Sequence, residues 1–188
     1  MINIKTMDQI IDFYSHEGTD HKGRTLKNIW NFSDDELEKD HEYIQWLFPT
    51  NVESKFNSNA PIVTPETICE FLESKEMVAN LIVSSFIFER FLELDKPTPF
   101  WTKKINGRDN HNCLRISRVI ACLNIFEQYE RASDFYEAVL KTYMAKNPSP
   151  IYHWDLAQIT SHPLGCASPL SATIVEMMEM EKCLIVPD

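Results

Sequence analysis

The stretch from Ser33 to Pro49, SDDELEKDHEYIQWLFP, carries the strongest signals for the fold. Its first four residues form a capping box. The Ser33 hydroxyl can accept a hydrogen bond from the backbone N–H of Glu36, whose carboxylate can reach back to the Ser33 N–H. Apolar residues follow at helical spacing, and the proline ends the run because it cannot continue a helix. The stretch therefore predicts a helix that starts after Ser33 and runs through Phe48.

Similar signals on both sides of this stretch predict further helices. Thr64 followed by Pro65 is typical of a helix start, with a capping side chain and a proline at the first helical position. Apolar periodicity predicts the remaining helices at 7–16, 26–30, 75–94, 112–126, 130–145 and 171–184, with a short one around 152–156. No stretch shows the alternation of a strand, and the segment 50–61 is predicted to be a loop.

We therefore expect an all-α fold in which about six to eight helices of unequal length pack orthogonally in one compact domain. The domain is expected to cover residues 1–160. Residues 161–188 are expected to form a C-terminal extension that is packed on the domain or partly mobile.

Composition narrows the class of protein. The chain has 188 residues, only 4 of them glycine, and a formal net charge of −10. Such an acidic chain is a poor match for nucleic acid or an anionic membrane, so both are disfavoured as partners. Its five cysteines form no CxxC pair, which favours a reducing compartment. The longest nearly uncharged run, 77–88, is too short to span a bilayer. We expect a soluble, acidic, cytoplasmic protein.

Four segments together resemble a known family. The run from Asp40 to Pro49 is similar to the H-x-Y-I-Q-W-L-F-P signature of the opioid growth factor receptor conserved region. Three more segments agree in the same order: residues 23–26 with Ile29-Trp30, then Ser54, Phe56-Asn57 and 59–61, and then 111–120. The likeness covers residues 13–157, and the compact chain most resembles the bacterial-type members.

The resemblance implies a receptor-like binding protein. The vertebrate member that names the family is a receptor for an endogenous opioid peptide and is associated with the nucleus and growth control, without being a seven-helix membrane receptor. The resemblance supplies no catalytic residues.

The predicted helix at 112–126 contains only two charged residues, Arg115 and Arg118. At about 100° per residue they share one stripe with His111, and Asn112 adjoins it. A buried guanidinium keeps its charge and needs an anionic or carbonyl partner. The stripe could bind a phosphate or carboxylate of a ligand. The alternative is internal pairing with acidic residues such as Asp34, Asp35 and Glu38.

The signature segment supplies a second set of candidates. On a continuous helix His41 and Gln45 would share a face, with Trp46 beside them, as a hydrogen-bonding and stacking surface. Asn57 and Asn59 in the following loop could line the same pocket. The alternative is that these polar groups bond neighbouring backbone and that the tryptophan belongs to the core.

Motifs for other chemistry are missing from the sequence. The six histidines are scattered without HExxH or paired Cys/His spacing, so no metal site is expected. No P-loop, Rossmann or GxSxG pattern is present, so we expect no cofactor and lean away from an enzyme.

Three functions stay open. The first is a binding module that holds a small anionic ligand or a peptide between the segments 41–49 and 111–120. The second is an enzyme acting on a nucleotide or phosphoester with His41 or His111 as the base. The third is a protein interaction module that uses the acidic surface and the Met-rich tail.

Overall fold

Eight α-helices and one short 3-10 helix form the part of the chain that can be described. The computed structural model describes residues 8–94, 103–105 and 111–144. The helices are α1 Gln9–Tyr14, α2 Leu26–Trp30, α3 Asp34–Lys39, α4 Ile44–Leu47, α5 Pro65–Glu73, α6 Lys75–Phe91, η1 Lys103–Ile105, α7 His111–Ile125 and α8 Tyr129–Met144. The described residues contain no strand, only one isolated parallel bridge between Thr50 and Ile62. The predicted all-α fold is confirmed.

Capping hydrogen bonds are present at the predicted helix starts Ser33 and Thr64. The Ser33 hydroxyl accepts from the Glu36 N–H, and the Glu36 carboxylate accepts from the Ser33 N–H at 2.8 Å. Thr64 caps α5 through the N–H of Thr67, with Pro65 at the first helical position. These caps satisfy N–H groups that a helix start leaves without intrahelical partners.

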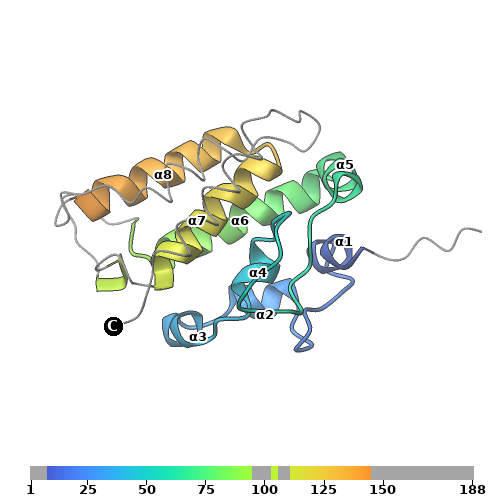
Figure 1. The fold of residues 1–188 in the computed structure, drawn as a ribbon, viewed down its shortest axis with the longest axis horizontal. Coiled ribbons are helices and arrows are strands. Elements are labelled where there is room, and N and C mark those ends of the chain that lie inside the picture. Colours follow the sequence, from blue (N-terminus) through green and yellow to red (C-terminus); the bar gives the residue numbers. More distant parts are fainter. Residues whose placement is uncertain (1–7, 95–102, 106–110, 145–188) are drawn as a thin grey trace, which may run out of the picture.

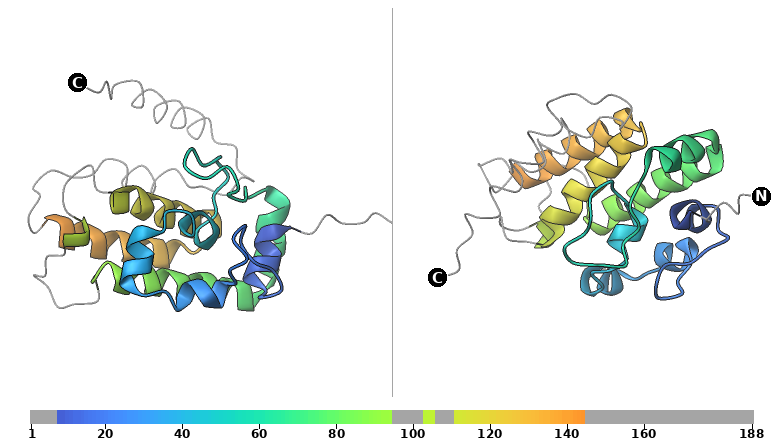
Figure 2. Two further views of the ribbon diagram at one scale, coloured as in Figure 1. Left: turned by 90° about the horizontal axis from the view of Figure 1, so that it is seen from below. Right: turned by 45° about the vertical axis from the view of Figure 1, so that its right-hand side comes forward.

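The long helices α6, α7 and α8 lie together on one side of the molecule, and the short helices α1 to α4 lie on the other (Figure 1). In two further views, α8 runs beside α7, and α5 lies at one end of α6 (Figure 2). None of the helices in the described ranges combines the length and apolar character needed to cross a bilayer.

Aromatic side chains join these two halves in the core. Phe88 of α6 lies 5.9 Å from Phe48, which follows α4, and 6.5 Å from Phe135 of α8, measured between ring centroids. Phe71 of α5 lies 4.2 Å from Phe126, which follows α7. All five rings are buried, so they contribute the large apolar area that stabilises the fold.

The helix predicted from Ser33 through Phe48 is interrupted, so that part of the prediction was wrong. Helix α3 ends at Lys39, and the Asp40 backbone is extended, with φ −81° and ψ 124°. The Asp40 carboxylate accepts from the backbone N–H of Glu42 at 2.7 Å and from the Arg24 guanidinium. These tertiary contacts hold an aspartate turn that local helix propensity does not reveal. As a result, His41 lies outside any helix and shares no helical face with Gln45.

Hydrogen bonds attach the short helices α1 and α2 to α6. The Asn80 amide donates to the Tyr14 carbonyl at 2.9 Å, and the Trp30 indole donates to the Ser84 hydroxyl at 2.9 Å. The Tyr14 hydroxyl also donates to the Leu47 carbonyl at the end of α4. The short helices therefore depend on long-range contacts more than on their own length.

The helices predicted around 152–156 and at 171–184, and the C-terminal extension 161–188, lie outside the described residues.

Candidate functional site

Arg115 is buried, with 5% of its surface exposed, and it donates to backbone carbonyls. Its guanidinium reaches the Leu37 carbonyl at 2.7 Å and the Asp40 carbonyl at 2.8 Å. The last carbonyls of a helix have no intrahelical partners and carry partial negative charge, so a cation there satisfies and stabilises them. The partners of Arg115 are thus carbonyls at the end of α3 and not the acidic side chains considered from the sequence.

Arg118 holds the segment that follows α4 in the same way. It donates to the Phe48 carbonyl and to the Thr50 hydroxyl, each at 3.2 Å. Burial lowers the pKa of Arg118 from its ordinary value. Both arginines therefore attach α7 to the two ends of the signature segment.

His111 and Asn112 lie at the start of α7, beside α3. The Asn112 amide donates to the Glu38 carboxylate at 3.2 Å, and its oxygen accepts from Arg115 at 3.1 Å. His111 Nε2 lies 3.2 Å from a Glu38 oxygen. Burial lowers the pKa of His111 and the neighbouring Arg115 lowers it further, which outweighs the opposite effect of Glu38.

The structure brings His41 and His111 together. Their ring centroids are 5.0 Å apart, with a 30° angle between the planes. His41 is exposed, so this pair lies at the surface where the turn after α3 meets α7. No group of three or more metal-binding side chains occurs within the described ranges.

Gln45 and Trp46 are buried in α4, with 4% and 3% of their surfaces exposed. The Gln45 Oε1 and Trp46 Nε1 atoms have no hydrogen-bond partner. Asn57 in the following loop is also buried, donates to the Glu42 carbonyl at 3.3 Å, and accepts from the Asn59 N–H at 2.9 Å. The loop therefore folds back against the turn that carries His41.

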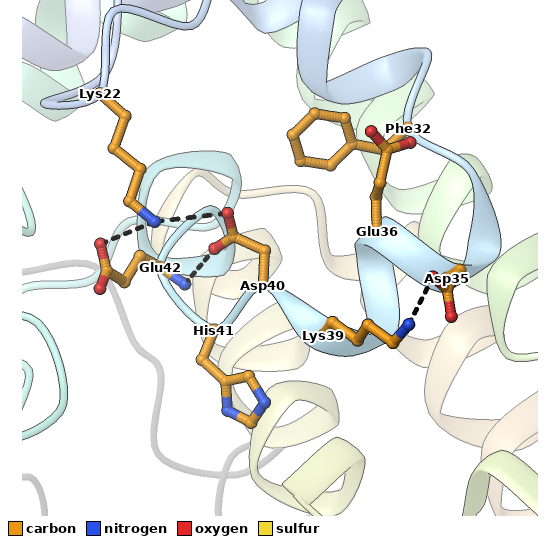
Figure 3. A pocket seen from close by; sticks show the side chains of 8 residues that line it. All are labelled: Lys22, Phe32, Asp35, Glu36, Lys39, Asp40, His41 and Glu42. Atoms are coloured by element: carbon orange, nitrogen blue, oxygen red, sulfur yellow. Dashed lines mark hydrogen bonds and ion pairs between the residues drawn. The ribbon is translucent and has the colours of Figure 1, made fainter.

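A first recess of about 550 Å³ lies over the turn after α3. Figure 3 shows the Lys22 ammonium between two carboxylates, 3.0 Å from Glu42 and 3.4 Å from Asp40, with His41 on the same turn. Phe32 adds an apolar ring to the lining, and Glu36 adds a further carboxylate. Hydrogen bonds from His21 and Lys22 lower the pKa of Glu42.

A second recess of about 430 Å³ lies between α1, the turn after it and the loop 58–60. Trp46 and Asn59, two of the predicted residues, line it together with Asp12, Asp20 and His21. The His21 ring stacks on Trp46 at a centroid distance of 6.1 Å, with planes 21° apart. His21 Nε2 also lies 2.9 Å from the Glu42 carboxylate of the first recess.

Sequence reasoning missed Asp12 and the residues 18–22, which line the two recesses. The Asp20 carboxylate accepts from the backbone N–H groups of Lys22 and Arg24, both at 2.9 Å, which closes a tight turn. Residues 23–26 resemble a family segment, but nothing in their pattern indicates a turn beside a recess. Asp12 follows an ordinary helical pattern and carried no signal at all.

The nine predicted site residues are therefore divided among three places. His41 lines the first recess, while Trp46 and Asn59 line the second. The remaining six lie in or beside the contacts that attach α7 and the loop to the signature segment: Gln45, Asn57, His111, Asn112, Arg115 and Arg118.

Comparison with known proteins gives one family. Residues 2–148 match the family described as "Opioid growth factor receptor (OGFr) conserved region". The rat and mouse proteins named opioid growth factor receptor-like protein 1 are each 27% identical to this chain over 133 residues, which cover 65% of this chain and 28% of theirs. The protein of that name from Xenopus tropicalis is 33% identical over 108 residues, 52% of this chain and 21% of its own.

The chain thus spans less than a third of the length of these relatives. No solved structure matches it. Because the family match covers most of the sequence, the chain belongs to the opioid growth factor receptor conserved-region family.

Proposed function

We propose that this chain is a non-catalytic module that binds a peptide across the two recesses beside the Asp20–Arg24 turn. The observation that carries the proposal is the position of His21. Its ring stacks on Trp46 of the second recess and its Nε2 bonds Glu42 of the first. An extended chain that follows the turn can place successive side chains in one recess and then the other.

The hydrogen bonds of the two arginines in α7 favour a peptide ligand over a small anion. Arg115 and Arg118 both donate to protein oxygens. The first recess is lined by four carboxylates and two lysines, so its fixed charge does not attract an anion. The two volumes, about 550 and 430 Å³, lie within the range of small-ligand sites and leave room for more than one peptide side chain.

Family membership agrees with a peptide ligand. The relatives are named as opioid growth factor receptor-like proteins, and a growth factor receptor binds its factor. The described residues lend no support to the enzyme hypothesis.

Selection from a library of random linear peptides, with the full 188-residue chain as bait, tests the proposal. A selected peptide is then titrated by fluorescence anisotropy against His41→Ala in the first recess and Asn59→Ala in the second. Each change is expected to weaken binding by about tenfold, which is the loss of one good contact. Asn51→Ala, an exposed asparagine that lines neither recess, is the matched control and should stay within about twofold of wild type.

A library that yields no binder would refute the proposal. A binder that is indifferent to both His41→Ala and Asn59→Ala would remove these two recesses from it.

A further inference from the structure

Helix α6 has an exposed apolar face in addition to the face that it buries in the core. Exposed residues recur along it at alternating spacings of three and four, and they form a line that we call the α6 stripe: Glu76, Ala79, Val83, Phe86 and Arg90. Val83 is 40% exposed and Phe86 is 53% exposed. This spacing places the five side chains on one side of the helix, with apolar residues in the middle and one charge at each end.

The α6 stripe is separate from the two recesses. Helix α6 lies wholly within the described residues, and none of its side chains lines either recess. In the left view of Figure 2, α6 runs along the side of the molecule opposite the loop 51–61. Helix faces in contact with water normally carry polar side chains, so an apolar stripe of this kind indicates a surface that another molecule covers.

The Phe86 ring is already held in place on this surface. The Arg131 guanidinium of α8 lies over the ring, 3.9 Å from its centroid. Arg131 is fixed in turn by an ion pair with Glu89, and it donates a hydrogen bond to the Ser85 hydroxyl at 2.7 Å. An ordered aromatic ring loses little conformational freedom on binding, so Phe86 is suited to anchor an interface.

The two charged ends of the α6 stripe have opposite signs. Glu76 lies in the first turn of α6 and Arg90 in the last. Within the described part of the chain, neither side chain makes a hydrogen bond or an ion pair. Val83 is the midpoint, seven residues from each end. The stripe is therefore complementary to itself when a second copy is turned end for end about Val83.

We propose that α6 packs in antiparallel orientation against α6 of a second copy of this chain, with Val83 on the two-fold axis. In this register Glu76 of each copy meets Arg90 of the other. Ala79 lies opposite Phe86 of the other copy, so a small side chain faces a large one, as interlocking helices require.

The α6 stripe is short, so the dimer is expected to be weak. Five side chains from each copy are fewer than the roughly 20–30 residues of a standard interface, and we expect a dissociation constant on the order of 10–100 µM. The charges at the ends fix the orientation and register more than they add to the affinity. At the low micromolar concentrations of a denaturation experiment the chain should therefore be mostly monomeric.

Sedimentation equilibrium of the full chain, at concentrations from about 1 µM to about 1 mM, tests the proposal. The average mass should rise from that of one chain, 21.9 kDa, towards twice that value. Val83→Glu brings two like charges together on the axis and should weaken association by at least about tenfold. Leu114→Glu adds the same charge at a residue of α7 that is 55% exposed, and this matched control should stay within about twofold of wild type.

Charge reversal tests the register. Glu76→Arg and Arg90→Glu should each weaken self-association by about fivefold or more, because each change turns two attractive pairs into two repulsive ones. The two single variants mixed together should associate as wild type does, since every charge then meets an opposite charge on the other copy. The double variant should do the same.

Three results would overturn the proposal. A chain that stays monomeric at the highest concentration would leave the α6 stripe to a partner of another kind. Association that is unchanged in Val83→Glu would show that the copies meet through a different surface. A mixture of the two charge-reversed single variants that associates no better than either alone would refute the antiparallel register.

Discussion

The guanidinium of Arg115 lies 2.8 Å from the carbonyl oxygen of Asp40, 75 residues away along the chain. This hydrogen bond connects α7 to the point where the signature segment leaves the helical path. The same guanidinium satisfies the Leu37 carbonyl, so one side chain closes the end of α3. The turn that carries His41 therefore depends on Arg115 for its shape.

Replacing Arg115 with glutamine is expected to lower the free energy of unfolding by about 3 kcal/mol, because it leaves several buried carbonyls unpaired. Urea denaturation followed by circular dichroism measures this change. Arg90→Gln, an exposed arginine in the last turn of α6, is the control and should change stability by less than about 0.5 kcal/mol. Equal stability of the two variants would contradict a structural role for Arg115.

Gly18 is expected to resist substitution because of space. A Cβ atom there would lie 2.8 Å from the Asp12 Cβ and 3.0 Å from the Asp12 carbonyl carbon. Gly18→Ala should therefore cost about 1–3 kcal/mol, as other overpacked sites do. The same denaturation experiment measures it.

Gly23 is expected to resist alanine because of backbone geometry. Its φ is +75°, and a Cβ atom added there would have no neighbouring atom within 4 Å. Gly23→Ala should cost about 1–2 kcal/mol, whereas Gly23→Asn should cost less because asparagine tolerates the left-handed region. At Gly18, by contrast, the larger asparagine should destabilise the fold more than alanine does. If alanine and asparagine rank in the same order at both glycines, one of the two explanations is wrong.

Asp40 is expected to contribute stability that disappears in acid. Burial alone would raise its pKa, but hydrogen bonds from the Glu42 N–H and from Arg24 outweigh burial and lower the pKa. A carboxyl whose pKa is lower in the folded state stabilises the fold above its unfolded pKa. That contribution is lost as the pH falls through the folded pKa, here below about pH 4.

The stability difference between wild type and Asp40→Asn should thus be largest at pH 7 and shrink below about pH 4. Denaturation at pH 7, 5 and 3 measures it. Asp35→Asn, which removes an exposed carboxylate that is ion-paired with Lys39, should show a much smaller pH-dependent difference. A wild-type advantage over Asp40→Asn that persists undiminished at pH 3 would contradict the assignment.

The cysteines of the described residues should differ in reactivity. Cys69 is exposed, whereas Cys113 and Cys122 are buried, and burial raises the pKa of the Cys122 thiol. Because the thiolate is the reactive species, a disulfide reagent should modify Cys69 in the native protein and the other two only after unfolding. The assay needs Cys166→Ser and Cys183→Ser as background. Rapid modification of Cys122 under native conditions would mean that α7 is less well packed than described.

The sequence predicted what depends on neighbours along the chain. Ser33 and Thr64 act on N–H groups three residues away, so their caps could be predicted, and with them the all-α class. The requirement of Arg115 for a partner could also be predicted, because a guanidinium cannot lose its charge on burial.

Features that depend on distant residues could not be predicted. The chain leaves the helix at Asp40 because Arg24 binds the Asp40 carboxylate and Arg115 binds the Asp40 carbonyl. Both arginines are many helical turns away from Asp40 in the sequence. The second recess likewise brings Asp12 of α1 and Trp46 of α4 into one lining through folding alone.

The bridge between Thr50 and Ile62 has a consequence for how this family diverges. The Val63 N–H donates to the Thr50 carbonyl at 3.0 Å, so the two ends of the segment 51–61 are held together at its base. Lengthening a loop whose ends are already joined costs little closure entropy. Insertions next to Phe56, which is 77% exposed, should therefore accumulate during evolution without disturbing the helices on either side.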